Sequence, residues 1–92
     1  MEILKNKGFR KHNMYYVKNN NEYYEIKSKI GEDCNPKEIS EDKYEKYKTI
    51  AEKEDGVAFT KDSIHCKTED VQKVNKKDIP LKVRNTIEKN IL

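Results

Sequence analysis

The segment from Met14 to Ile30, MYYVKNNNEYYEIKSKI, constrains the fold more than any other part of the chain. Two runs rich in tyrosine and β-branched residues flank three asparagines at positions 19–21. Asparagine tolerates the positive φ that a tight hairpin loop requires. The second run alternates and places Tyr24, Ile26 and Ile30 on one face. We therefore predict a β-hairpin whose second strand is half-buried.

The sequence leaves the register of this hairpin open, and a shift of one residue exchanges the two faces of a strand. A three-residue loop turns Tyr16 and Met14 toward the core, whereas a four-residue loop turns Val17 and Tyr15 there. Either register leaves one of the two adjacent tyrosines on the opposite face, together with Tyr23, Lys27 and Lys29. We expect this second face to be exposed, aromatic and basic.

The segments around the hairpin predict two helices. Ser40 is a good N-cap for a helix that begins at about Glu41, and Gly56 is placed to end it. Asp78 is expected to cap a last helix with Pro80 in its first turn. One face of that helix carries apolar residues four apart, namely Ile79, Val83, Ile87 and Ile91.

The remaining segments give shorter elements. Residues 57–67 predict a second hairpin with a turn at 61–63, and residues 68–74 predict one or two helical turns. The first seven residues fit a short helical turn or an edge strand. The fold class is therefore α+β, a single domain over 1–92 in which small antiparallel hairpins pack against helices 41–54 and 79–91.

Two helix starts resemble each other at an offset of forty residues: Asn35 to Ser40 matches Asn75 to Pro80 as N-x-K-[DE]-I-[SP]. The order hairpin, loop, helix also repeats, which suggests a duplicated ββα unit with sub-units 9–55 and 57–92. The alternative is that helix starts converge on the same capping chemistry.

Composition bounds the size of the core and indicates the source of the gene. Charged residues make up 40% of the 92 residues and hydrophobic residues only 34%, so the core is small and a partner or a second copy is expected to complete it. Eighteen of the twenty basic residues are lysine, and asparagine, isoleucine and tyrosine are frequent. These residues have A/T-rich codons, which indicates a low-GC bacterium or one of its phages.

The charges are segregated along the chain. Residues 1–30 carry seven basic and three acidic side chains (+4), residues 31–60 five and nine (−4), and residues 61–92 eight and five (+3). Such a pattern can steer a charged partner, although surface charge often only keeps a small domain soluble. No signal-peptide core or membrane-length apolar run is present, so we expect a cytoplasmic protein whose Cys34 and Cys66 are reduced.

No residue pattern supports catalysis or metal binding. His12, Cys34, His65 and Cys66 are zinc-ligand types, but they do not form the close pairs on turns that zinc sites use. Nothing orients a nucleophile or an acid–base pair. We expect no enzymatic activity and no cofactor.

The segment from Leu4 to Val17, LKNKGFRKHNMYYV, resembles the start of the small HicA-type toxin ribonucleases. In that family a helix ends at Gly-Phe before a strand that is preceded by a functional histidine, and His12 answers to that histidine. Arg10 and Lys11 replace the small-residue pair that normally precedes it. The resemblance implies a toxin ribonuclease as an alternative function.

The favoured hypothesis is a small intracellular protein, encoded by a phage or another mobile element, that inhibits a larger protein or nucleoprotein by occupying its surface. A host defence nuclease is one such target. The alternative is a single-stranded nucleic-acid binder that stacks bases on tyrosines and binds phosphates with lysines. The hairpin residues expected to bind a partner are Tyr15, Tyr16, Lys18, Tyr23, Lys27 and Lys29. The first helix would add phosphate-mimicking carboxylates from Glu41, Asp42 and Glu45.

Overall fold

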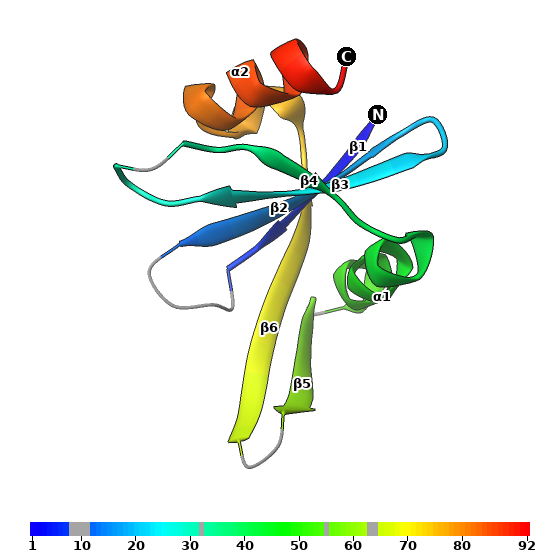
Figure 1. Ribbon diagram of the computed structural model, residues 1–92. Coiled ribbons are helices and arrows are strands. Elements are labelled where there is room, and N and C mark those ends of the chain that lie inside the picture. Colours follow the sequence, from blue (N-terminus) through cyan, green and yellow to red (C-terminus); the bar gives the residue numbers. More distant parts are fainter. Residues whose placement is uncertain (8–11, 32, 55, 63–64) are drawn as a thin grey trace.

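A six-stranded antiparallel sheet with one helix on each face forms the body of the computed structural model (Figure 1). The structure describes residues 1–7, 12–31, 33–54, 56–62 and 65–92, and for residues 60–62 and 65–68 it describes the backbone alone. The elements in chain order are β1 (Glu2–Asn6), β2 (Asn13–Asn19), β3 (Glu22–Ser28), β4 (Pro36–Glu38), α1 (Glu41–Glu52), β5 (Val57–Asp62), β6 (His65–Val74), a 3-10 helix (Lys76–Asp78) and α2 (Leu81–Asn90).

The strand order is β4-β3-β2-β1-β6-β5, and every neighbouring pair is antiparallel. The predicted α+β class is therefore confirmed. The ββα duplication is not: four strands precede α1 and only two lie between α1 and α2.

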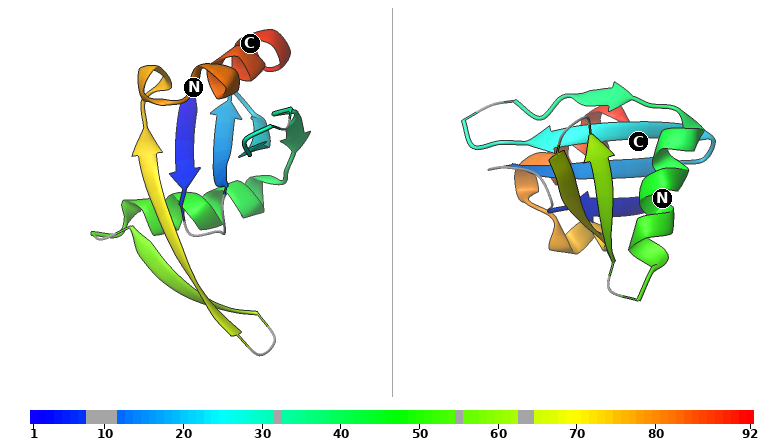
Figure 2. Two further views of the ribbon diagram at one scale, coloured as in Figure 1. Left: turned by 90° about the vertical axis from the view of Figure 1, so that its left-hand side faces the viewer. Right: turned by 90° about the horizontal axis from the view of Figure 1, so that it is seen from below.

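The sheet has a hydrophobic cluster on each face because successive side chains of a strand point to opposite sides. Helix α2 covers one face, and α1 lies across the strands on the other (Figure 2). The cluster on the α2 side contains Ile3, Tyr15, Val17, Ile26, Cys34, Ile79, Val83, Ile87 and Ile91. The cluster on the α1 side contains Leu4, Tyr16, Tyr23, Tyr44, Tyr47, Ile50 and Val71.

The predicted hairpin is confirmed as β2 and β3, but both proposed loop lengths are wrong. Asn19 pairs with Glu22, so the turn has two residues, and Asn20 takes the positive φ (57°) that such a turn requires. Tyr15 then lies opposite Ile26, and both face α2. Ile30, predicted to be in the core, lies beyond the strand and is 99% exposed.

The expectation of an exposed aromatic face on this hairpin is also wrong. The face that carries Tyr16 and Tyr23 packs under α1, where Tyr16 stacks on Tyr47 and Tyr23 contacts Tyr44. The prediction considered one buried face, whereas the hairpin is covered on both. Its three inner tyrosines are core residues.

Helix α1 begins at Glu41 as predicted, because the Ser40 hydroxyl accepts a hydrogen bond from the Lys43 amide at 3.2 Å. Helix α2 carries the predicted apolar face, but its N-cap is Pro80 and Asp78 lies in the preceding 3-10 helix. The predicted cap at Asp78 is therefore wrong.

Two strands differ from the sequence prediction. Within the first seven residues, Glu2–Asn6 form β1, which is a central strand between β2 and β6 rather than an edge. Residues 68–74, predicted as helical turns, belong to β6, because pairing with β1 and β5 holds them extended. The three-residue strand β4 was not predicted.

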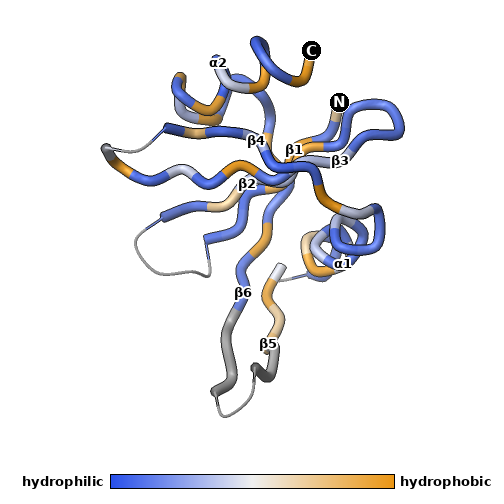
Figure 3. The backbone as a smooth tube through the Cα atoms, in the orientation of Figure 1, coloured by the Kyte–Doolittle hydropathy of each residue, from blue (hydrophilic) through white to orange (hydrophobic). Residues whose placement is uncertain are grey.

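The predicted second hairpin is confirmed and projects from the body (Figure 1). Its predicted turn at 61–63 is wrong at Lys61 and Asp62, which belong to β5, and position 63 lies outside the described residues. β1 pairs with β6 only over Val71–Val74, while residues 65–70 of β6 pair with β5. We call β5 together with residues 65–70 the arm. Its first strand is hydrophobic where it leaves the body, at residues 57–59 (Figure 3).

Candidate functional site

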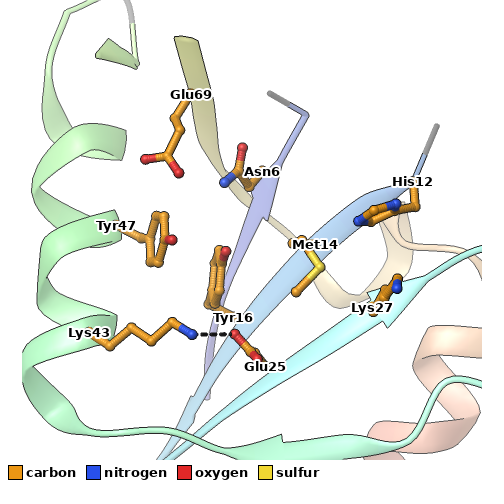
Figure 4. A pocket seen from close by; sticks show the side chains of 9 residues that line it. All are labelled: Asn6, His12, Met14, Tyr16, Glu25, Lys27, Lys43, Tyr47 and Glu69. Carbon is orange, nitrogen blue, oxygen red and sulfur yellow. Dashed lines mark hydrogen bonds and ion pairs between the residues drawn. The ribbon is translucent and has the colours of Figure 1, made fainter. Parts of the chain in front are cut away.

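A pocket of about 330 Å³ opens between α1 and the sheet, beside the root of the arm (Figure 4). This volume is at the lower end of the range for small-ligand sites. Its lining comes from α1, from four strands and from His12, which precedes β2: Asn6, His12, Met14, Tyr16, Glu25, Lys27, Lys43, Tyr47 and Glu69.

The pocket exists because α1 covers only part of its side of the sheet. Asn6 pairs with Met14, and Met14 pairs with Lys27, so these three residues form a row across β1, β2 and β3. The next row, Tyr16 and Glu25, lies nearer to α1. The first row therefore forms a floor beside the helix.

Two parallel tyrosine rings form the wall on the helix side. The ring centroids of Tyr16 and Tyr47 are 4.1 Å apart, with an interplanar angle of 9°. Burial raises the pKa of the Tyr16 hydroxyl, and the neighbouring Tyr47 hydroxyl raises it further. The buried Asn6 amide lowers that pKa in part. The wall therefore consists of two stacked rings, and the Tyr16 hydroxyl is protonated at neutral pH.

Glu69 supplies a buried carboxylate on the arm side of the pocket. Its side chain is only 5% exposed, and Figure 4 shows it reaching from β6 toward the space beside Tyr47 and Asn6. One of its oxygens, Oε2, has no hydrogen-bond partner within the described structure. A buried carboxylate oxygen without a donor is energetically costly, so this end of the pocket favours a donor-rich ligand group.

The other charged groups are arranged differently. Lys43 reaches from α1 to Glu25, with Nζ 2.9 Å from Oε2, so these two charges largely satisfy each other (Figure 4). Lys27 is exposed at the opposite end, near His12. The pocket therefore presents an unsatisfied acceptor at its buried end and positive charge at its rim.

The structure separates the residues predicted to bind a partner. Tyr15, Tyr16 and Tyr23 are buried, and Lys18 lies 5.8 Å from the Tyr23 ring centroid. Only two predicted site residues, Tyr16 and Lys27, meet in the pocket. Lys27 and Lys29 are exposed, as are Glu41 and Asp42 on α1, while Glu45 is half-buried.

Helix α1 directs two of its lysines toward sheet carboxylates. Lys43 pairs with Glu25, and Lys48 lies 3.7 Å from Glu2. The positive charge of these two lysines is therefore partly neutralised by the sheet. This leaves the outer surface of its first turn acidic, at Glu41 and Asp42.

Sequence reasoning missed Asn6, Tyr47 and Glu69 as pocket residues. Tyr47 lies on the buried face of α1, but the open space beside it depends on how far the helix reaches across the sheet. Glu69 and Val71 are two residues apart, and their side chains point to the same side of β6. That period of two was the signal for a strand, and the helical interpretation of 68–74 obscured it.

The predicted zinc-type residues do not form a site in the part of the chain that the structure describes. Cys34 is buried in the cluster under α2, while His12 lines the pocket on the α1 side. The side chains of His65 and Cys66 lie outside the described residues. Within the described residues, no group of three or more His, Cys, Asp and Glu side chains is placed to hold a metal ion.

The HicA-type resemblance requires a helix before Gly8, whereas residues 2–6 form strand β1. Comparison of the chain with protein-family models, with curated proteins and with solved structures finds no match. No helix among the described residues has the length and apolarity needed to cross a membrane.

Proposed function

We propose that this chain is a small interaction protein that docks on a larger protein through its arm and inhibits it by occupying that surface. The observation that carries this proposal is Phe59, which is 76% exposed on the arm outside both hydrophobic clusters. Aromatic side chains in such positions are the usual anchors of protein interfaces.

The hydrogen bonding of the arm supports the same function. β5 is the outermost strand of the sheet and pairs only with β6 in the described structure. A two-stranded ribbon outside the core is marginally stable by itself, and an unpaired edge strand is a template for another extended segment. We propose that the partner adds a strand to β5 and buries Phe59 at the same time.

A protein partner fits the surface better than single-stranded nucleic acid. Base stacking on the hairpin would require exposed tyrosine rings, but Tyr15, Tyr16 and Tyr23 are buried. The acidic start of α1 is the second candidate docking surface, and it would act by phosphate mimicry. The arm is favoured because it combines an aromatic anchor with an open backbone edge.

Affinity capture from a low-GC bacterial lysate tests the arm. The tagged chain is compared with Phe59→Ser and with Leu81→Ser, a matched control that removes another apolar side chain, 65% exposed, from α2. We expect Phe59→Ser to lose the partner, while Leu81→Ser and a triple alanine variant of Glu41, Asp42 and Glu45 retain it. Hydrogen exchange of the β5 amides in the recovered complex should slow.

Three results would contradict the proposal: no protein retained at moderate salt, capture that survives Phe59→Ser, or retention that nuclease treatment abolishes. Light scattering of the isolated chain provides a further check. We expect a monomer, because a second copy that covered the arm would compete with the partner. A stable dimer lost in Phe59→Ser would identify the arm as a self-association surface instead.

A further inference from the structure

We propose that the pocket between α1 and the sheet is a binding site for a guanidinium group, with Glu69 as its counter-charge. The inference does not depend on the function proposed for the arm. It depends on the coincidence of a cavity of about 330 Å³ with a buried carboxylate that has an unpartnered oxygen.

The carboxylate argues for a cationic ligand. An ionised side chain that is removed from water without a partner destabilises the fold by several kcal/mol, so proteins normally pair it. Glu25, the other acidic residue of the pocket, is paired with Lys43, whereas Oε2 of Glu69 has no such partner in the described structure. A bound cation would supply the missing donor.

The shape and chemistry of the wall favour a guanidinium over an ammonium ion. A guanidinium is planar, presents a fork of N–H donors to a carboxylate and stacks on aromatic rings. Glu69 provides the carboxylate, and the Tyr47 ring stands beside it. A divalent cation would need several oxygen ligands, and among the described residues this end of the pocket offers one carboxylate with an unpartnered oxygen.

The rim indicates what is attached to the guanidinium. Lys27 and His12 lie at the end opposite Glu69, where they favour an anionic or carbonyl-bearing group. The ligand class is therefore arginine-like, with a cation at one end and acceptors at the other. Free arginine and an arginine side chain within a peptide both satisfy this chemistry.

Thermal unfolding of the full chain at low salt tests the site with four probes: methylguanidinium, methylammonium, L-arginine and the peptide acetyl-Gly-Arg-Gly-amide. We expect the guanidinium probes to raise Tm in proportion to the logarithm of their concentration, and methylammonium to act at least tenfold more weakly. Glu69→Gln should abolish the shift, while Glu54→Gln, which alters an exposed carboxylate after α1, should leave it unchanged. Protection by the peptide but not by L-arginine would assign a protein side chain as the ligand, and the reverse would assign a small molecule.

The stability of the unliganded variant separates a binding residue from a structural one. Because Glu69→Gln keeps the shape of the side chain and removes a carboxylate whose buried Oε2 has no partner in the described structure, we expect its Tm without ligand to equal or exceed that of the wild type, by up to about 8 °C. A clear fall in Tm, or failure to fold, would show that Glu69 is a structural residue and would overturn the proposal. Equal shifts with methylguanidinium in the wild type and in Glu69→Gln would also overturn it, as would the absence of any shift.

Discussion

A single side-chain hydrogen bond ties α1 to the first strand of the sheet. The hydroxyl of Tyr44 donates to Oε1 of Glu2 at 2.6 Å, and the Tyr44 side chain is buried. The bond lowers the pKa of Glu2, and the positive charge of Lys48 lowers it further. Burial raises the pKa of Tyr44, and the same hydrogen bond adds to that effect.

We expect Tyr44→Phe to reduce the free energy of unfolding by about 1.5–3 kcal/mol at pH 7, the usual contribution of a hydrogen bond to a charged group. Because the pKa of Glu2 is lowered in the folded state, its contribution is present above the unfolded pKa near 4.3 and disappears as pH falls through the folded pKa. The loss in Tyr44→Phe should therefore shrink in acid. Urea unfolding between pH 3 and pH 8 measures it.

Tyr24→Phe is the matched control for this prediction. The Tyr24 hydroxyl also donates to a glutamate, Glu22, at 2.7 Å, but this bond lies at the surface. We expect no measurable loss of stability in this variant. Equal losses of stability in the two variants would show that the Tyr44–Glu2 bond contributes no more to stability than the exposed Tyr24–Glu22 bond.

The buried tyrosines also predict alkaline unfolding. Burial is the main cause of the raised pKa of Tyr15, Tyr16 and Tyr44. An unfolded tyrosine ionises near pH 10, so stability is complete below that pH and falls above it by about 1.4 kcal/mol per pH unit for each buried tyrosine. Denaturant titrations at pH 9–11.5 measure the slope. In Tyr44→Phe the slope should be smaller by the contribution of one tyrosine, about 1.4 kcal/mol per pH unit. An unchanged slope would contradict the prediction.

At the scale of elements, the root of the arm depends on Gly56. This residue has φ of +64°, and a Cβ built there would lie 2.8 Å from the backbone oxygen of Val71 and 2.5 Å from Nε2 of Gln72. Its carbonyl accepts a hydrogen bond from the Val71 amide at 2.8 Å. The chain therefore turns into β5 through a position where a side chain has no room.

Gly31→Ala provides a direct comparison with Gly56→Ala. Gly31 also has a positive φ, +82°, but a Cβ there would meet no atom within 4 Å. Both variants carry the backbone cost of about 1–2 kcal/mol, and only Gly56→Ala adds a clash with backbone. We expect the loss of stability in Gly56→Ala to exceed that in Gly31→Ala by at least about 1 kcal/mol in chemical denaturation. Similar losses of stability in the two variants would contradict the conclusion that a side chain has no room at Gly56.

The elements that sequence reasoning predicted correctly are those with local signals. The cap at Ser40 and the asparagine turn at Asn20 act within a few residues, and both features lie where the pattern placed them. The central position of β1 and the extended form of residues 68–74 arise from pairing between segments some seventy residues apart. Glu69 could not be placed in a pocket before that pairing was known, and the cover on both faces of the hairpin was not visible from either strand alone.

At the scale of the whole molecule, the two clusters share a single sheet. Tyr15 and Tyr16 are neighbours in β2, yet one packs under α2 and the other under α1. A substitution that loosens packing in one cluster therefore also destabilises the other cluster, because both depend on the backbone of the same central strands. This arrangement predicts one cooperative unfolding transition for both clusters.

Ile87→Ala tests that coupling from the α2 side. Ile87 is fully buried, so its truncation should reduce the free energy of unfolding by about 2–5 kcal/mol, whereas Leu81→Ala at an exposed position of the same helix should change it by less than about 0.5 kcal/mol. Amide exchange in α1, on the opposite face, should accelerate in Ile87→Ala. If α1 kept its wild-type protection, the two clusters would unfold independently.

The two outer strands of the sheet differ in a way that limits how many further strands the molecule can bind. At one side the sheet ends in β4, which has three residues and begins with Pro36, a residue without an amide hydrogen. At the other side it ends in the six residues of β5. A sheet with two open edges can polymerise, but a sheet with one open edge stops growing after a single addition. Each chain can therefore accept one strand at β5, and a pair of chains joined there would have no long edge left for a third.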